Sequence, residues 1–204
     1  MSLLLPLGRI EEAERLLRES MALDPLNMSF QFMYIGLLLT KHDYEGLLRH
    51  LRHLPEKVRH TPALITTECL AYFDQGDVEN VSLSLQRLLT MENADPQQTA
   101  GCETYWHLLN GDRAAALASY QRREALIGEG RDYSYVLGNQ ALLLGDIERA
   151  MDWFERALVS REQRIIFIRT DHREEAELKA NTRFQALLRK MRLDDESLRE
   201  MGYL

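Results

Sequence analysis

Histidine is the residue type whose spacing in this sequence comes nearest to that of a metal site. His42, His50, His53 and His60 lie within nineteen residues, and His50 and His53 are three positions apart. On a helix, side chains at that spacing share a face and can chelate a divalent metal ion. Three of the four histidines have an arginine as their sequence neighbour. Because these positive charges oppose the binding of a cation, we interpret the histidines as part of a solvated face and predict no metal site.

No other spacing of reactive residues indicates catalysis. Gly128-Glu129-Gly130 lacks the third glycine and the preceding strand of a phosphate-binding loop, and no His-Glu-x-x-His motif occurs in the sequence. Cys69 and Cys102 are 33 positions apart and lack the spacing of a metal or redox pair. We therefore predict that they are free thiols in a reducing compartment. We expect a protein that is not an enzyme, with no catalytic residues and no cofactor.

Composition and charge narrow the class of partner. The 204 residues carry a net charge of −7, which argues against general nucleic-acid binding. No apolar run reaches 18 residues, and Met1–Leu7 is too short for a secretory signal. We expect no membrane contact and a cytoplasmic location. Residues 161–192, however, carry nine Lys or Arg against five Asp or Glu. This basic segment is interpreted as a solvated helical cap or as a docking surface for an acidic neighbour.

A short block of residues returns along the chain at a nearly fixed interval. Successive blocks are 34, 34, 35 and 34 positions apart. Such a period indicates stacked helical repeats that share one continuous core. The blocks begin at Gly8, His42, Gly76, Gly111 and Gly145.

Each block is predicted to be the turn between two helices. In Gly145-Asp146-Ile147-Glu148, the glycine can end one helix in the left-handed conformation, the aspartate can cap the next, and the glutamate suits its positive end. Thr61-Pro62 and Asp95-Pro96 close repeats, because proline cannot continue a helix. We expect first helices at 28–41, 62–75, 97–110 and 131–144, second helices at 9–22, 43–54, 77–91, 112–126 and 146–160, and inter-repeat turns at 54–61, 92–97 and 128–130.

The pattern resembles the tetratricopeptide repeat. Residues that match the small, aromatic and proline positions of that family are Cys69, Gly138, Ala13, Ala116, Ala150, Tyr120, Phe154, Ala157 and Pro25. Departures are His42 and Asn110 at the turn glycine, Leu47 and Val81 at the packing alanine, and Arg123 at a later alanine. The resemblance implies an all-α, right-handed solenoid of about four and a half repeats over residues 1–160, the first truncated at its N-terminus, with C-terminal capping helices over 161–204.

A second resemblance lies in Asn181–Met191, which is similar to the tail that closes tetratricopeptide arrays in bacterial signalling proteins. It implies the C-terminal part of a larger bacterial transcriptional or signalling regulator. By register, Met1 lies about eight residues into a first helix, so we expect further protein before it or pairing of this end with a second copy. The tail has an apolar stripe that can cover the last repeat, formed by Phe184, Leu187, Leu188 and Met191.

In tetratricopeptide proteins the first helices line a concave surface that holds another polypeptide. Carried over by register, the lining in this sequence is apolar and aromatic, which suits an amphipathic helix or a hydrophobic segment. The alternative is that several of these side chains are ordinary core between helices. The predicted partner-binding residues are Phe32, Met33, Thr66, Phe73, Tyr105, Tyr135 and Asn139.

We therefore predict a non-catalytic protein–protein interaction module that presents a curved face to a partner protein or peptide. Direct nucleic-acid binding by this region is not expected. Two alternatives remain open. The chain is a stand-alone assembly adaptor, or it is a sensor domain that binds a small ligand between its helices and controls an attached effector.

Overall fold

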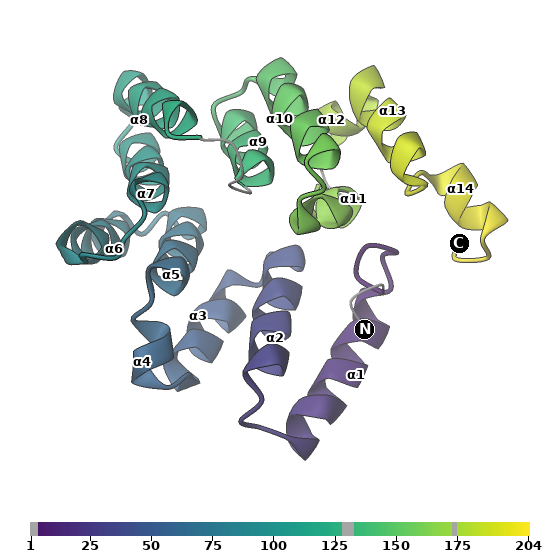
Figure 1. The fold of residues 1–204 in the computed structure, drawn as a ribbon, viewed down its shortest axis with the longest axis horizontal. Helices are drawn as coiled ribbons and strands as arrows, with labels where there is room; N and C mark the ends of the chain where they lie inside the picture. Colours follow the sequence, from purple (N-terminus) through teal and green to yellow (C-terminus); the bar gives the residue numbers. More distant parts are fainter. Residues whose placement is uncertain (1–3, 128–132, 173–174) are drawn as a thin grey trace. The chain divides into compact units, whose positions relative to one another are not determined.

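The computed structural model describes residues 4–127, 133–172 and 175–204. Throughout these ranges the regular structure is helical, and no strand occurs in them (Figure 1). The all-α class predicted from the sequence is therefore confirmed, whereas the solenoid arrangement of the whole chain stays a prediction. No helix in the described ranges is long and apolar enough to cross a membrane.

The chain divides into two compact units. The middle unit, Tyr44–Tyr133, contains α3 (Tyr44–His53), α4 (Glu56–Arg59), α5 (Pro62–Asp74), α6 (Val78–Thr90), α7 (Pro96–Leu109) and α8 (Arg113–Ala125). The terminal unit joins the residues up to Asp43 with those from Ser134 onward. It contains α1 (Ile10–Leu23), α2 (Met28–Thr40), α9 (Ser134–Leu143), α10 (Ile147–Val159), a 3₁₀ helix (Gln163–Phe167), α11 (Ile168–Asp171), α12 (Ala176–Ala180), α13 (Thr182–Met191) and α14 (Asp195–Glu200).

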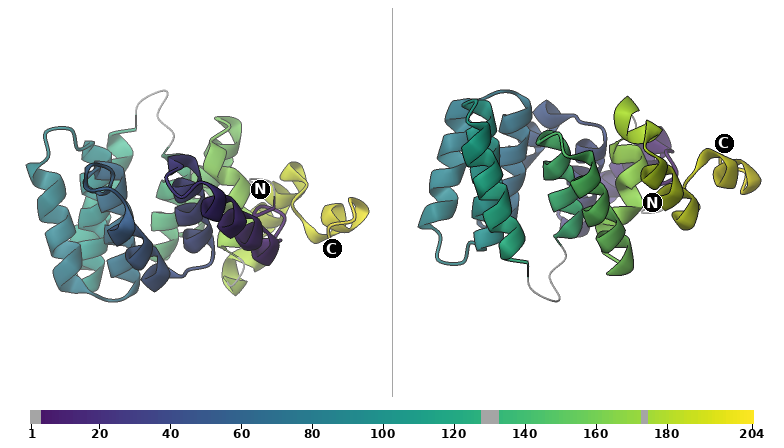
Figure 2. Two further views of the ribbon diagram at one scale, coloured as in Figure 1. Left: turned by 90° about the horizontal axis from the view of Figure 1, so that it is seen from below. Right: turned by 90° about the horizontal axis from the view of Figure 1, so that it is seen from above.

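Consecutive helices pack in pairs within each unit. In the middle unit α5 packs on α6 and α7 on α8, and α7 also contacts α5 and α6, so the two hairpins lie side by side (Figure 1; Figure 2). In the terminal unit α1 packs on α2 and α9 on α10. The ends of these helices differ from the predicted ends by one residue or less, apart from the start of the helix predicted at 131–144, where residues 131–132 lie outside the described ranges.

The turns between paired helices follow the predicted chemistry. Gly76, Gly111 and Gly145 have φ angles of 69°, 74° and 74°, in the left-handed region that favours glycine. His42 adopts the same conformation with φ of 54° although it carries a side chain. Asn110 is right-handed, because α7 is one residue longer than the period requires and Gly111 makes the turn. The aspartates that follow the three glycines each cap the next helix.

The connection predicted as a turn at 54–61 contains a short helix. Pro55 precedes α4, and its fixed φ suits the start of a helical turn. Thr61-Pro62 then ends the connection as predicted, with Pro62 as the first residue of α5. The turn predicted at 128–130 lies outside the described residues.

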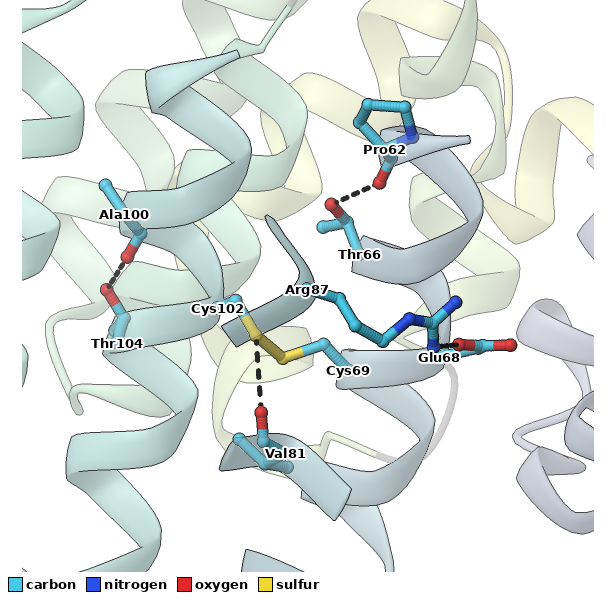
Figure 3. Close-up of a disulfide and its surroundings, with 9 residues drawn as sticks. All are labelled: Pro62, Thr66, Glu68, Cys69, Val81, Arg87, Ala100, Cys102 and Thr104. Carbon is cyan, nitrogen blue, oxygen red and sulfur yellow. Dashed lines mark hydrogen bonds and ion pairs between the residues drawn. A yellow bond between two sulfur atoms is a disulfide. The ribbon is translucent and has the colours of Figure 1, made fainter. Parts of the chain in front are cut away.

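A disulfide crosses the core of the middle unit. Cys69 on α5 and Cys102 on α7 are both fully buried, and their Cα atoms are 6.1 Å apart (Figure 3). The prediction of free thiols was therefore wrong. It was drawn from sequence spacing, whereas the pairing follows from the packing of two first helices that place residues of successive repeats against each other. The surrounding core includes Ile65, Val81, Leu88 and Tyr105.

The core of the terminal unit joins segments from both ends of the chain. Phe167, from the 3₁₀ helix, packs against a cluster of α1 and α2 that includes Ile10, Leu17 and Leu37. Leu5 is buried in the same cluster, so part of the apolar N-terminal end is covered within the unit. Near the C-terminus, α13 packs on α10 and buries most of the apolar stripe predicted for it, namely Phe184, Leu187 and Leu188.

Candidate functional site

The predicted partner-binding residues of the terminal unit lie in two environments. Phe32, on α2, is 49% exposed, whereas Met33 packs against the core of α1 and α2. Tyr135, on α9, is fully buried, and its ring centroid is 5.6 Å from that of Phe154. Asn139, one turn later, is partly buried. Tyr135 thus fits the alternative of ordinary core, and Phe32 is the most exposed of the four predicted residues.

In the middle unit the structure brings two predicted residues together. The rings of Phe73 on α5 and Tyr105 on α7 are 4.8 Å apart between centroids. Tyr105 is buried in the core cluster, and Phe73 packs against that cluster. Thr66, also on α5, is partly buried and donates its hydroxyl to the Pro62 carbonyl at 2.9 Å. Tyr105 is therefore core, while Thr66 and Phe73 keep part of their surface accessible.

The most exposed apolar side chains lie outside the predicted set. Leu23 and Leu26, around the turn between α1 and α2, are 89% and 86% exposed, and Val159 at the end of α10 is 75% exposed. Leu83 and Leu89 on α6 also face solvent. Helical spacing assigns a residue to a face of its helix, but it does not indicate whether another segment of the protein covers that face. Sequence reasoning therefore missed these positions.

A polar cavity of about 630 Å³ opens in the terminal unit. It lies among α11, α12, α13, α14 and the start of α1, and its lining includes four cationic and three acidic residues. Arg169 Nη2 lies 3.0 Å from Asp195 Oδ1, and Arg199 shares the same carboxylate. Part of the charge in the cavity is therefore balanced within the protein.

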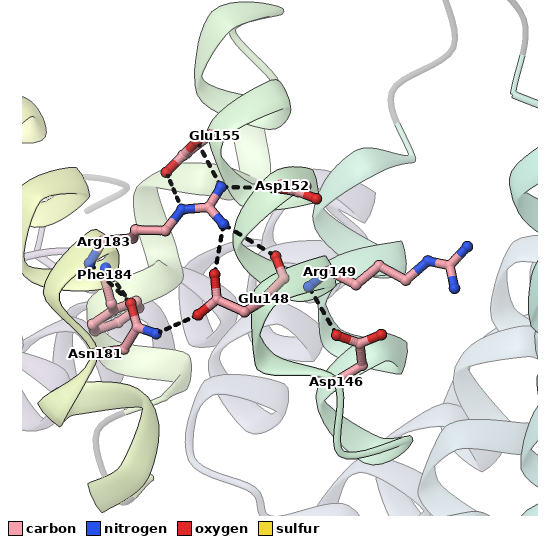
Figure 4. A network of polar contacts seen from close by, with 8 residues as sticks. All are labelled: Asp146, Glu148, Arg149, Asp152, Glu155, Asn181, Arg183 and Phe184. Atoms are coloured by element: carbon pink, nitrogen blue, oxygen red, sulfur yellow. Dashed lines mark hydrogen bonds and ion pairs between the residues drawn. The ribbon is translucent and has the colours of Figure 1, made fainter.

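Three arginines of the basic segment 161–192 form ion pairs within the terminal unit. Arg183 on α13 contacts Glu148, Asp152 and Glu155 of α10 at 2.7 to 3.1 Å (Figure 4). These carboxylates, Glu155 first, raise the pKa of Arg183 above its ordinary value. Two further arginines of the segment pair with carboxylates of α14. The pairing favours the interpretation as a helical cap over that as a docking surface.

Arg123, a departure from the tetratricopeptide pattern, is 2% exposed inside the middle unit. Its Nε donates to Gln97 Oε1 at 3.3 Å, and Gln97 Nε2 donates to the Arg123 carbonyl at 2.9 Å. Burial lowers the pKa of Arg123, and nearby tyrosines oppose that shift. A Cβ at Gly101 would lie 2.8 Å from Arg123 Nη1, so the glycine leaves room for the guanidinium. These contacts fix α7 against α8, which is a structural role.

The four histidines considered as metal ligands are spread over both units. His42 lies in the terminal unit, and the other three lie in the middle unit. His53 Nδ1 is 2.7 Å from the Arg49 carbonyl on the same helix. Within the described ranges, no group of three or more His, Cys, Asp and Glu side chains could hold a metal ion.

A partly buried aspartate, Asp171, joins α2, α9 and α11 in the terminal unit. Asp171, the last residue of α11, accepts from Tyr135 Oη at 2.7 Å and from Thr40 Oγ1 at 3.0 Å. His42 Nε2 lies 3.0 Å from the Asp171 carbonyl. Burial, followed by the charge of Asp171, raises the pKa of Tyr135 well above its ordinary value. The Tyr135 hydroxyl therefore keeps its proton and donates it to the carboxylate.

The next residue, His172, continues this network. It is buried, its Nε2 lies 3.2 Å from Asn139 Oδ1, and its Nδ1 lies 2.7 Å from Glu175 Oε1. The ring also packs beside Phe154, at 5.4 Å between centroids. Sequence reasoning selected Tyr135 and Asn139 as groove residues but missed the partners that hold them. No local spacing marks those partners, because the contacts link segments more than thirty residues apart.

Comparison with known proteins adds no relative. No protein-family model, curated protein or solved structure matches the chain. The tetratricopeptide resemblance therefore depends on the residues and on their period.

Proposed function

We propose that the chain is a non-catalytic interaction module, a right-handed solenoid of tetratricopeptide-like hairpins that binds a partner protein or peptide. The observation that carries the proposal is the apolar character of α2 around its whole circumference. Its thirteen residues include three polar side chains, Ser29, Gln31 and Thr40. A helix of this kind needs cover on more than one side. The α1 helix packs on one side and α11 contacts another, yet Phe32 stays 49% exposed.

The partner is expected to cover Phe32 with apolar side chains of its own. The test compares purified wild-type chain with Phe32→Ser as bait for crosslinking and mass spectrometry in a bacterial lysate. The matched control is Val159→Ser, because Val159 is apolar, lies in the same unit and is 75% exposed. We expect a crosslinked protein that Phe32→Ser loses and Val159→Ser keeps, at unchanged melting temperatures. Retention by Phe32→Ser, or loss by both variants, contradicts the proposal.

The polar cavity favours a second candidate function, a sensor of small ligands. Its volume of about 630 Å³ lies in the range of small-molecule sites, and its lining offers charges of both signs. A ligand that binds only the folded state must raise the melting temperature. A thermal-shift screen of charged metabolites, repeated with Lys179→Ala and Arg189→Ala, tests this function. A hit whose shift survives both substitutions binds elsewhere and contradicts it.

We further propose that this region belongs to a larger bacterial transcriptional or signalling regulator of the cytoplasm. The resemblance of Asn181–Met191 to the closing tail of such proteins supports this view. The Cys69–Cys102 disulfide instead favours location in an oxidising compartment, because disulfides are rare in cytosolic proteins. Trapping thiols with an alkylating agent in intact cells decides between the two. The reading frame ahead of Met1 separates a regulator from a stand-alone adaptor.

A further inference from the structure

The polar cavity of the terminal unit is lined by segments from both ends of the chain. Gly8 and Ile10, at the start of α1, contribute to the lining, and the rest of it comes from α11 to α14. Arg169 of α11 reaches the first of these segments, because a Cβ at Gly8 would lie 3.2 Å from its Nη1 atom. Gly8 has a φ of 79°, which favours glycine. The glycine therefore allows the first turn and Arg169 to lie in contact at the cavity.

Two arginines of the lining share one carboxylate. Arg169 Nη2 lies 3.0 Å from Asp195 Oδ1, and Arg199 Nη2 lies 4.0 Å from Asp195 Oδ2. The Arg169 side chain is 23% exposed, so solvent screens its ion pair only in part. Because two cations face a single anion, these three residues form a wall of the cavity that keeps a positive charge.

The other charges of the lining come from separate helices according to their sign. Lys179 on α12 and Arg189 on α13 are cationic, whereas Asp194 and Glu196 at the start of α14 are acidic. Within the described ranges, no ion pair engages the side chain of Arg189 or Glu196. Asp194 Oδ1 accepts from the backbone N–H of Ser197 at 3.0 Å, while Oδ2 has no hydrogen-bond partner in those ranges. The cavity therefore offers a cation and two carboxylates that the protein itself leaves unpaired.

This combination of charges disfavours a ligand of a single sign. A simple anion attracted to Arg189 would meet the like charges of Asp194 and Glu196, and a simple cation would meet the arginines. Apolar surface lies beside the charges, because Ile10 and Leu188 belong to the lining although each is 6% exposed. That surface suits the uncharged body of an organic molecule.

We propose that the cavity binds a small zwitterion, in which a carboxylate and an ammonium group are joined by a short apolar body, as in a free amino acid or a short peptide. The ligand carboxylate pairs with Arg189 and Lys179, and the ligand ammonium pairs with Asp194 and Glu196. An ammonium that reaches Asp194 Oδ2 displaces no bond within the protein. The inference rests on the proposed sensor function, because it names the class of ligand for the same cavity.

The direct test is a nuclear magnetic resonance titration of the ¹⁵N-labelled chain with L-alanine and with trialanine, which separates a free amino acid from a peptide. We expect at least one of them to shift the backbone amide signals of Gly8, Thr170 and Glu196, while the signals of α5 and α7 stay in place. The matched probes are the N-acetyl and C-terminal amide forms of the compound that binds. Each lacks one charge and should bind about tenfold more weakly.

Substitutions assign each ligand charge to its partner. Arg189→Gln should weaken binding of the zwitterion about tenfold and should not further weaken the amide form, which has no carboxylate. Asp194→Asn should do the same for the ammonium, compared with the N-acetyl form, because asparagine keeps the cap of α14. The controls are Lys190→Gln and Glu177→Gln, which make the same changes of charge at exposed positions outside the lining.

The inference and the sensor function fail on different results. If an N-acetyl or amide form binds as tightly as the free compound, the cavity takes a simple ion, which overturns the zwitterion and leaves the sensor function standing. Absence of shifts at the cavity with both L-alanine and trialanine overturns it as well, as do equal losses from Arg189→Gln and Lys190→Gln. The sensor function itself fails when the thermal-shift screen yields no hit that depends on Lys179 or Arg189.

Discussion

Gly138 shows how one residue fixes the distance between two helices. It lies on α9, and a Cβ built on it would lie 2.4 Å from Phe154 Cε1 of α10. Phe154 is fully buried, so its ring cannot swing into solvent. We expect Gly138→Ala to lower the free energy of unfolding by about 1–3 kcal/mol through overpacking. Denaturant unfolding at neutral pH measures the change.

Gly36 provides the matched control for that prediction. It lies inside α2 of the same unit, and a Cβ there would meet nothing within 4 Å. Gly36→Ala should raise stability by about 0.4–1 kcal/mol, because alanine costs less backbone entropy in a helix. If both substitutions shift the unfolding midpoint in the same direction, the contact with Phe154 does not explain the role of Gly138.

At the residue scale, the sequence predicts which side chains are buried better than it predicts which side chains contact each other. The family positions matched by Gly138, Ala150 and Phe154 are buried as their small or aromatic types suggest. The environments of Arg123 and the two cysteines could not be predicted from their residue types. Their environment depends on a partner in another helix, and no local pattern indicates the distance to it.

At the element scale, Asp77 makes the start of α6 sensitive to acid. Asp77 accepts from the backbone and side-chain nitrogens of Asn80 at 3.0 and 2.7 Å. These bonds, the side-chain bond first, lower the pKa of Asp77 below its ordinary value. The cap is therefore present above the unfolded-state pKa, near pH 4, and is lost as the pH falls through the folded-state pKa.

We expect Asp77→Ala to lower the free energy of unfolding by about 0.5–2 kcal/mol at pH 7, because it removes the cap of α6. Asparagine caps nearly as well and does not titrate. Asp77→Asn should therefore lose less stability than the wild type between pH 5 and pH 3. Urea unfolding at each pH provides the comparison, and an equal loss in both proteins would show that Asp77 adds nothing to the acid sensitivity.

Arg183 links two elements by charge rather than by apolar contact. Its guanidinium contacts three carboxylates of α10 that are themselves largely exposed. Each exposed ion pair contributes little to stability. Arg183→Gln should therefore lower the free energy of unfolding by about 1 kcal/mol, and by less at high salt, which screens the charges. Unfolding in 50 mM and 1 M NaCl tests this expectation. Arg192→Gln, which breaks a single exposed pair with Glu200, should cost less. Equal costs would show that the three pairs do not act together.

The ends of the hairpin helices were predictable because residues next to each end determine them. A glycine with positive φ and a following aspartate stop one helix and start the next. Other elements were not predictable for the opposite reason. Glu162 caps α9 from 28 positions away, so neither residue reveals the cap in its own neighbourhood. The short α4 within the predicted turn at 54–61 likewise has too few residues for a period to appear.

At the scale of the whole molecule, the period of 34 residues predicted paired helices, but it did not predict where the chain divides. The terminal unit is discontinuous, because Phe167 and Asp171 bind the first hairpin to segments that follow the last one. A repeat count treats each hairpin as a neighbour of the next and contains no information on contacts between the first and last. The candidate groove residues were limited in the same way, since burial of Tyr105 and Tyr135 depends on neighbouring helices.

The disulfide provides a test of whether the two units act separately. It links α5 and α7 inside the middle unit, across 33 positions of sequence. Reduction removes a constraint on the unfolded chain and should lower the free energy of unfolding by about 2–4 kcal/mol. Hydrogen exchange measured by mass spectrometry with a reductant should then quicken in α5 and α7 and stay unchanged in α9 and α10. The Cys69→Ala, Cys102→Ala double variant is the control, because a reductant should leave its exchange unaltered. Faster exchange throughout the wild type would instead mean that the chain opens as one cooperative body.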